Sequence, residues 1–228
     1  MKVFITGING DIAKNICQHL KYKYHSCEIY GIDLHSNATH EFCDEYIQFD
    51  LSKPVWCNLF SEYFDLVINN AAIQIVKPFF DLSDDDIDNI TNVNLLNPIK
   101  MLKKLNYSNN SNIINIGSIH SSQTKKGFTI YSTTKGGLES LTKALSVELS
   151  PNIRVNMIKP AAINTKMLKN GLSKEGYDKL SSYHPVNKIG DPNNISNLII
   201  SIISNPFLNG SIIELDGGIS NVLNDPDK

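Results

Sequence analysis

The stretch KVFITGINGDIA, residues 2–13, decides the fold, because it joins a short apolar run to the start of a helix through a glycine-bearing loop. Residues 3–5 form the run, and a helical pattern follows the loop. Gly7 permits a tight turn, and Gly10 lets the backbone approach a ligand closely. The free N–H groups at the start of such a helix attract an anion. The spacing therefore predicts a pyrophosphate-binding turn, with an ordinary strand–helix turn as the alternative.

Three further residues sharpen this prediction. Ala13 is small enough for close packing of the helix on the strand. The carboxylate of Asp11 would repel a pyrophosphate, so we expect it to cap the helix while turned away from the ligand. Asp33 ends the next apolar run, twenty residues after Ala13. A carboxylate there can accept hydrogen bonds from a ribose diol, although turn aspartates are also common at strand ends.

Apolar runs and helical patterns alternate along the rest of the chain. The predicted strands cover residues 3–5, 28–32, 46–49, 66–68, 113–116, 154–158 and 211–215, and the predicted helices cover about 11–20, 83–105 and 129–149. Ser83 and Asp86 are placed as an N-cap and its acidic partner, and Pro98 should kink or interrupt the second helix. Strand–helix–strand units imply parallel strands.

The predicted fold class is therefore α/β, a Rossmann-like doubly wound parallel sheet of about seven strands in a three-layer α/β/α arrangement. One NAD(P)-binding domain would occupy residues 1–228. Residues 160–190, the covering segment, break the alternation and are rich in Asn, Lys, Gly and Ser. Because ligands bind beyond the carboxyl ends of parallel strands, this segment is placed to cover one.

Composition excludes several classes of protein. The 228 residues carry a formal net charge of −2, so no basic surface for nucleic acid is expected. The longest apolar stretch, 198–203, falls far short of the roughly 20 residues that cross a bilayer. Four cysteines without CxxC or zinc-like spacing indicate reduced thiols in a cytoplasmic protein, with no metal site. Residues 2–6 already read as a strand, which leaves no room for a signal peptide.

Tyr131 and Lys135 form the candidate catalytic pair. They lie four residues apart in the predicted helix 129–149, so both side chains share one face. A nearby ammonium favours phenolate and would lower the pKa of the tyrosine. A tyrosine tuned in this way can act as a general acid or base. On spacing alone, a surface pair is the more common explanation.

The pair stands in a series of segments that follow one another in a fixed order. They are Asn69-Asn70-Ala71-Ala72, Asn94, Ser118, Tyr131 thirteen residues later with Lys135, Pro160 to Thr165, and Asp216-Gly217-Gly218. From about Lys2 to Gly218 the sequence thereby resembles the single-domain branch of the short-chain dehydrogenase/reductase family. Ala72 and Ala161 stand where the family has glycine, and the gap between Gly7 and Gly10 is more similar to its extended branch.

The resemblance implies an NAD(P)-dependent oxidoreductase that interconverts an alcohol and a ketone or aldehyde. Tyr131 would exchange the proton of the substrate oxygen, and Ser118 would hold that oxygen. Lys135 would lower the pKa of Tyr131 and bind the nicotinamide ribose, while Asn94 would anchor a proton-relaying water. The candidate cofactor-binding residues are Gly7, Asn9, Gly10, Asp11, Ile12, Asp33, Leu34, Asp50, Leu51, Asn70, Ala71, Ala72, Tyr131, Lys135, Pro160, Ala161, Ile163 and Thr165.

Asp33 favours NAD(H) over NADP(H), because a 2′-phosphate would bring a like charge against its carboxylate. Residues 34–37 supply no cation to offset that repulsion. Asp50 and Leu51 resemble the family's adenine-contacting pair and fit either cofactor. The resemblance also implies a homodimer or homotetramer, associating through helices 83–105 and 129–149. An apolar stripe on the second helix could serve that contact or simply face the sheet.

The substrate is expected to be a small molecule, such as a polyol, a sugar, a hydroxy acid or a ketone, beneath residues 166–190. His120 either lines its pocket or lies in a surface loop. Two other functions are alternatives to an oxidoreductase. A catalytically silent NAD(H)-sensing protein of this fold would lack the tyrosine–lysine pair or the serine. A scaffolding protein would not need the covering segment.

Overall fold

The computed structural model describes residues 1–54, 59–170 and 172–223. The strands are β1 (Lys2–Thr6), β2 (Glu28–Asp33), β3 (Glu45–Gln48), β4 (Tyr63–Asn69), β5 (Asn106–Ile116), β6 (Ile153–Pro160) and β7 (Ile212–Leu215). The α-helices are α1 (Asp11–Lys23), α2 (Asp84–Thr91), α3 (Asn97–Leu102), α4 (Thr129–Glu148), α5 (Lys166–Asn170), α6 (Lys174–Ser182) and α7 (Pro192–Ser204). The shorter turns are η1 (Phe79–Asp81), the π-helix η2 (Asn92–Leu96), η3 (Ile119–Ser121) and η4 (Ile219–Asn221).

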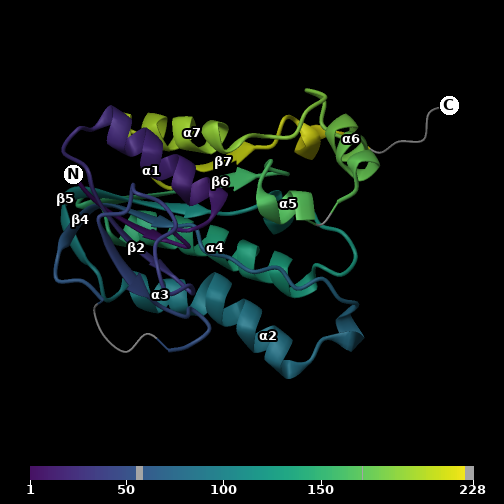
Figure 1. Ribbon diagram of the computed structural model, residues 1–228, viewed down its shortest axis with the longest axis horizontal. Coiled ribbons are helices and arrows are strands. Elements are labelled where there is room, and N and C mark those ends of the chain that lie inside the picture. The colour runs from purple at the N-terminus through teal and green to yellow at the C-terminus, as the bar shows by residue number, and fades with distance from the viewer. Residues whose placement is uncertain (55–58, 171, 224–228) are drawn as a thin grey trace.

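The strands form one parallel sheet in the order β3-β2-β1-β4-β5-β6-β7. Helices α1 and α7 cover one face, and α2, α3 and α4 cover the other (Figure 1). This arrangement confirms the predicted doubly wound parallel sheet in three layers. The strand order changes direction between β1 and β4, which opens a crevice at their carboxyl ends. Figure 1 shows α5 and α6 beyond the end of the sheet that lies opposite the N-terminus.

Each face of the sheet has its own apolar core. On one face, Ile16 and Leu20 of α1 and Ile199 of α7 are fully buried against the strands. On the other face, Met101 of α3 packs against Phe64 and the rest of a second cluster. The strands are apolar toward both faces because helices cover both. This double burial fixes the carboxyl ends of the strands, where the candidate site residues lie.

The interruption predicted for the helix over 83–105 is confirmed, although the helix ends at Leu102 and not near residue 105. Ser83 and Asp86 form the expected capping box, but the α-helix stops at Thr91 and a π-turn follows. α3 then ends at Leu102. Pro98 lacks an N–H and cannot donate to the carbonyl four residues before it, so the chain widens locally instead of continuing as a regular helix.

Two other differences concern elements without a clean sequence pattern. β5 begins at Asn106, not at residue 113, because Asn106 and Tyr107 pair with the first residues of β4. The register shifts between Phe64 and Leu66, where the two strands accommodate an irregularity. Helix α7 was not predicted at all. A capping box at Asp191 and Asn194, with proline at the first helical turn, begins it.

Candidate active site

The glycine loop after β1 has the geometry that a phosphate-binding turn requires. Gly7 has φ of 67°, and a Cβ added to it would lie 2.9 Å from Ala71 Cα. Its N–H and that of Ile8 donate to Ile32 O at 2.8 and 3.2 Å. Gly10 is the N-cap of α1 and offers no side chain to its free N–H groups. The backbone N–H groups in the first turn of α1 are therefore not capped by a side chain, an arrangement that suits an anion.

The segment after β4 is fastened to this loop. Asn70 Nδ2 donates to the carbonyls of Thr6 and Gly7 at 3.1 and 3.2 Å. Thr6 Oγ1 accepts from the backbone N–H groups of Asn70 and Ala71, both at 3.0 Å. β1 and β4 are neighbours in the sheet, and these hydrogen bonds join the predicted cofactor residues that follow the two strands. Sequence reasoning missed the role of Thr6, a buried hydroxyl directly before the glycine.

The predicted role of Asp11 as an N-cap was wrong. Gly10 is the N-cap, and Asp11 is the first residue of the helix. Its Oδ2 accepts from Lys166 N at 2.5 Å, at the start of α5. The neighbouring Ile12 packs against the core on the α1 face. Asp11 therefore links the phosphate loop to the covering segment, a contact across 155 residues that no local pattern could reveal.

Asp33 is the last residue of β2, as predicted. Its Oδ2 accepts from Asn9 N at 3.0 Å, which fixes the carboxylate beside the glycine loop. The Asn9 side chain binds Asn37 O and Thr39 N, and so holds the loop after β2 in place. Leu34 is 59% exposed at the start of that loop.

Asp50 and Leu51, the two residues predicted to contact the adenine, have different structural roles. Asp50 Oδ1 accepts from Ser52 N at 2.8 Å and shapes a turn. Leu51 is 7% exposed, and its side chain belongs to the core beneath α3. Asn97 Nδ2 donates to Leu51 O at 2.7 Å and ties this turn to α3. The turn thus stands at the carboxyl edge of the sheet, as the adenine-contacting prediction requires.

Ser118, Tyr131 and Lys135 come together at the end of β5 and on the first turns of α4. Their exposed fractions are 7%, 9% and 2%. The side chains of Ser118 and Gln74 lie close enough to the Tyr131 phenol to act on its pKa. Lys135 Nζ donates to Ile116 O at 3.0 Å and lies 5.6 Å from the centroid of the Tyr131 ring. The structure thus brings the predicted serine, tyrosine and lysine into one cluster.

Burial dominates the titration of this cluster. It raises the pKa of Tyr131, while the hydrogen bonds from Ser118 and Gln74 act in the opposite direction. It lowers the pKa of Lys135 to about 8. The predicted lowering of the tyrosine pKa by Lys135 was therefore wrong for this arrangement. The reason is that the ammonium bonds to a backbone carbonyl and both groups are cut off from water.

Asn94 lies in the π-turn and is 2% exposed. Its amide is fully engaged: Oδ1 accepts from Ile73 N at 2.9 Å, and Nδ2 donates to Ile73 O at 3.0 Å and to Thr134 Oγ1 at 3.3 Å. The side chain thus clamps the segment after β4 to α4. The backbone carbonyl of Asn94 is the group left without its usual helical donor, because that donor would be Pro98.

Residues 160–165 leave β6 and pass toward the covering segment. Ala161 N donates to Leu215 O at 3.3 Å, and Ile163 pairs with Gly190 in an isolated bridge. Thr165 Oγ1 accepts from Leu168 N at 3.4 Å at the start of α5. Positive φ at non-glycine positions occurs, within the described ranges, only at Asn110 and Asn187. Alanine at 72 and 161 therefore costs no backbone strain.

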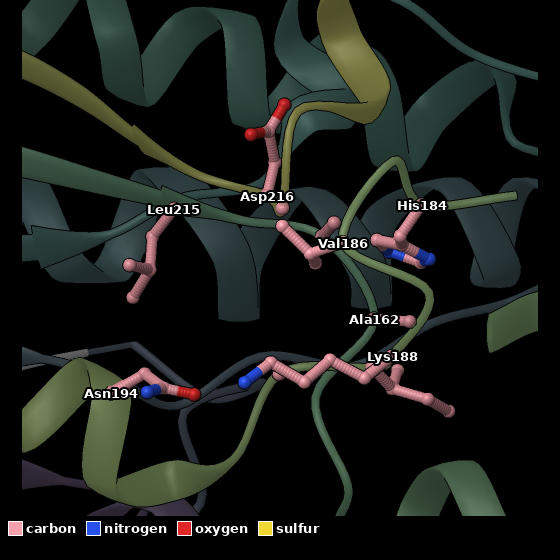
Figure 2. Close-up of a pocket in the computed structure, with 11 residues that line it drawn as sticks. Ala162, His184, Val186, Lys188, Asn194, Leu215 and Asp216 are labelled. Carbon is pink, nitrogen blue, oxygen red and sulfur yellow. The ribbon is translucent and has the colours of Figure 1, made fainter. Parts of the chain in front are cut away.

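A cavity of about 190 Å³ lies between the covering segment and the end of β7. Figure 2 shows Ala162, His184 and Lys188 on its walls, together with Leu215. Asp216 points its carboxylate away from this hollow and accepts from the N–H groups of residues 218 and 220. None of the predicted catalytic residues lines the cavity, so it is separate from the serine–tyrosine–lysine cluster.

Two residues beside Tyr131 were missed or left open by the sequence. Gln74 was missed, although it is a polar interruption in the apolar run Ile73–Val76. His120 lies against the cluster: its ring stacks on Phe128, with centroids 4.6 Å apart, and meets the Tyr131 ring edge-on at 5.7 Å. Burial, followed by the charge of Lys125, lowers the pKa of His120. The histidine is thus a neighbour of Tyr131 and not a remote loop residue.

In the part of the chain that the structure describes, no three His, Cys, Asp or Glu side chains form a group that could hold a metal ion. No helix within the same ranges is long and apolar enough to cross a membrane.

A glycine turn at a helix start, a strand-end aspartate and a serine–tyrosine–lysine cluster thus lie on one parallel sheet, which is the arrangement that the resemblance to the short-chain dehydrogenase/reductase family implies. Comparisons with known proteins agree. The sequence profile of a family described as enoyl-(acyl carrier protein) reductase matches residues 58–220. The chain is 30% identical to the 3-oxoacyl-(acyl-carrier-protein) reductase FabG of Aquifex aeolicus (strain VF5), over 95% of this chain and 86% of that protein.

Two further comparisons extend this result. Carbonyl reductase (NADPH) 2 of Sus scrofa is 33% identical over 68% of this chain and 67% of its own length. The crystal structure of a short chain dehydrogenase family protein from Francisella tularensis subsp. tularensis SCHU S4 superposes with a TM-score of 0.87 and 25% identity, covering 97% of this chain and 99% of that one. The chain belongs to the short-chain dehydrogenase/reductase family and is an oxidoreductase of that family.

Proposed function

We propose that this protein interconverts an alcohol and a ketone or aldehyde by hydride transfer, with Tyr131 as general acid and base. The observation that carries the proposal is the buried cluster in which Ser118 lies close to the Tyr131 phenol and Lys135 lies beside the same ring. Four chemically suitable groups, with Asn94 as the fourth, converge on one end of the sheet although they are spread over residues 94–135. Such convergence is the geometric criterion for a catalytic site.

The residues at the carboxyl edge fit a nicotinamide dinucleotide. Gly7 and Gly10 leave the backbone open to a pyrophosphate, since a side chain at Gly7 would collide with Ala71. Asp33 would meet the adenosine ribose, Asp50 and Leu51 the adenine, and Asn70 to Ala72 the adjoining sugar and phosphate. Residues 160–165 would embrace the nicotinamide. The bound cofactor would donate or accept the hydride.

The chain's own groups would manage the proton. In reduction, Tyr131 Oη donates its proton to the carbonyl oxygen while the Ser118 hydroxyl hydrogen-bonds the same oxygen. The raised pKa of Tyr131 keeps the phenol protonated at neutral pH, which suits this direction. Lys135 would bind the nicotinamide ribose and support the developing phenolate. A water bound to the backbone carbonyl of Asn94 would relay protons back to the site. The side-chain amide would not hold this water, because its hydrogen bonds are used within the protein.

We propose NAD(H) as the preferred cofactor. Asp33 supports this choice, because its carboxylate is held beside the glycine loop by Asn9 N. A ribose hydroxyl can donate to such a carboxylate, whereas a 2′-phosphate would be repelled. Lys14, the nearest cation in α1, is exposed and follows the first turn of the helix. The NADPH in the name of the porcine relative makes a direct comparison of the two cofactors necessary.

The substrate would be a small molecule beneath the covering segment, in one domain spanning residues 1–228. Its class stays open among 3-oxoacyl thioesters, ketones, sugars, polyols and hydroxy acids. The test is a turnover assay over such a panel with NADH and NADPH, with Tyr131→Phe as the control. Turnover of no compound by the wild type, or equal turnover by Tyr131→Phe, would refute the proposal.

We also propose a homodimer or homotetramer. The apolar stripe on α4 does not supply the contact, because Leu141 and Leu145 pack against the core on that face of the sheet and Leu138 is buried. Exposed apolar residues on these helices include Leu96, at 41%, and Val147, at 80%. Sedimentation at micromolar concentration that shows only a 25.4 kDa species would refute the assembly.

A further inference from the structure

A buried lysine that the proposed reaction does not use lies at the end of β6. Lys159 is 3% exposed and directly precedes Pro160. Its ammonium lies 3.5 Å from Glu139 of α4 and 3.2 Å from Glu214 of β7, and it donates to Ser122 Oγ at 2.9 Å. An ammonium out of water needs such partners, because burial of an isolated charge is costly. Four segments of the chain therefore meet at this one charge.

Lys159 and Glu139 each make one contact with the far end of η3, the short turn that follows the catalytic serine. Ser121 Oγ donates to Glu139 Oε2 at 2.8 Å, and this is the same oxygen that faces Lys159. The next residue, Ser122, accepts from Lys159 itself. At the near end of the turn, Ser118 Oγ accepts from His120 N at 3.2 Å. The conformation of η3 and the direction of the Ser118 hydroxyl are therefore coupled.

We propose that Lys159 and Glu139 are positioning residues that hold η3 so that Ser118 presents its hydroxyl to Tyr131 and the substrate oxygen. The inference rests on the proposed function, since it assumes that Ser118 acts in catalysis. Neither residue touches the reacting atoms. A displacement of about 1 Å at a reacting group can lower a rate by roughly 10²-fold, so a loosened turn should be visible in kcat.

Lys143 provides a matched control on the same carboxylate. Its Nζ contacts Glu139 Oε1 at 2.8 Å, a shorter ion pair than that of Lys159. Its side chain is 59% exposed, and it uses the oxygen that Ser121 does not. Removal of Lys143 therefore weakens the charge pairing of Glu139 and leaves the two bonds to the turn in place.

The experiment is a double-mutant cycle on the carbonyl compound that the wild type reduces fastest in the substrate panel. Lys159→Met should lower kcat by about tenfold or more, with NADH affinity, measured by fluorescence titration, changed by less than about twofold. Lys159→Arg should recover most of the rate, and Lys143→Met should match the wild type. In a Ser118→Ala background, Lys159→Met should lower kcat by less than about twofold, because the group that it positions is gone.

An equal loss in both backgrounds would overturn the inference, because Lys159 would then act on stability or elsewhere in the site. If Lys159→Met does not fold, Ser122→Ala removes the same contact to the turn and enters the same cycle. Crystal structures give a readout that is independent of activity. The variant should lose the contact between Ser118 Oγ and His120 N, and an unchanged turn would refute the idea. Failure of the proposed function looks different, since Tyr131→Phe would then retain its rate.

Discussion

The catalytic end and the nucleotide end of this sheet hold their residues by different means. At the catalytic end the acting groups are side chains: Ser118, Tyr131 and Lys135 are all less than a tenth exposed, and Ser118 and Lys135 are hydrogen-bonded to the backbone. At the nucleotide end, the loop from Gly7 to Gly10 would act through its backbone, and the carboxylate of Asp33 is held beside it by Asn9 N. A reaction at one substrate atom requires catalytic side chains in fixed positions, whereas binding of a pyrophosphate requires free backbone N–H groups and space beside them. Variants at the catalytic end should therefore lower mainly the rate, and variants at the nucleotide end should weaken mainly the cofactor affinity.

The largest expected effect is on the catalytic side. Tyr131→Phe removes the exchangeable proton and almost no volume, so turnover should fall by about 10²–10⁴-fold while NADH affinity stays nearly constant. Steady-state kinetics and a fluorescence titration measure the two quantities. Tyr22→Phe, at a tyrosine that is 84% exposed, is the control. More than about a tenth of the wild-type rate in Tyr131→Phe would remove Tyr131 from the mechanism.

Lys135→Met should lower both rate and cofactor affinity, and so test whether one residue joins the two ends. We expect a loss in kcat/KM of about 10²-fold, since a buried ammonium beside the phenol and the ribose is removed. The sign of the pH effect follows from the charge. Burial lowers the pKa of Lys135 to about 8, so the wild-type rate should fall as the pH rises through about 8 and the ammonium is lost, and Lys135→Met should lack this fall. An unchanged pH profile would make Lys135 a bystander.

Gly7→Ala should act on the nucleotide end alone. The residue has φ of 67°, and a Cβ would press within 2.9 Å of Ala71 Cα, so both the turn and the β4 segment must move. Backbone strain of roughly 1–3 kcal/mol predicts a cofactor affinity weaker by about tenfold or more. Gly136→Ala is the control, because it lies in α4 and its added Cβ would come no nearer than 3.8 Å to Ser121 O. Equal NADH affinity in wild type and Gly7→Ala would show that this loop does not bind the pyrophosphate.

The sequence predicted correctly those elements whose structure depends on residues close together in the chain. Apolar runs located all seven strands, and the glycine spacing located the turn before α1. The polar start of β5 escaped, because only pairing with β4 makes it a strand. The partner of Asp11 and the amide contacts of Asn94 also escaped, since they join residues distant in sequence. The pKa of Tyr131 depends on burial, which the Tyr-x-x-x-Lys spacing does not encode. α7 was missed although its cap residues, Asp191 and Pro192, were readable.

The smallest expected effect concerns the choice of cofactor. It tests how far the carboxylate of Asp33 determines the preference for NAD over NADP at the nucleotide end. Wild type should favour NAD over NADP in kcat/KM by at least about tenfold, which corresponds to roughly 1.4 kcal/mol. The reason is that Asp33 Oδ2 is held by Asn9 N and cannot easily turn away from a 2′-phosphate. Asp33→Ala should lose much of this preference, mostly through better use of NADP, because repulsion disappears while the glycine loop is unchanged. Asp50→Ala serves as the control, since it removes a nearby carboxylate that shapes a turn after β3. A wild type that prefers NADP would show that the carboxylate of Asp33 serves the loop and not the ribose.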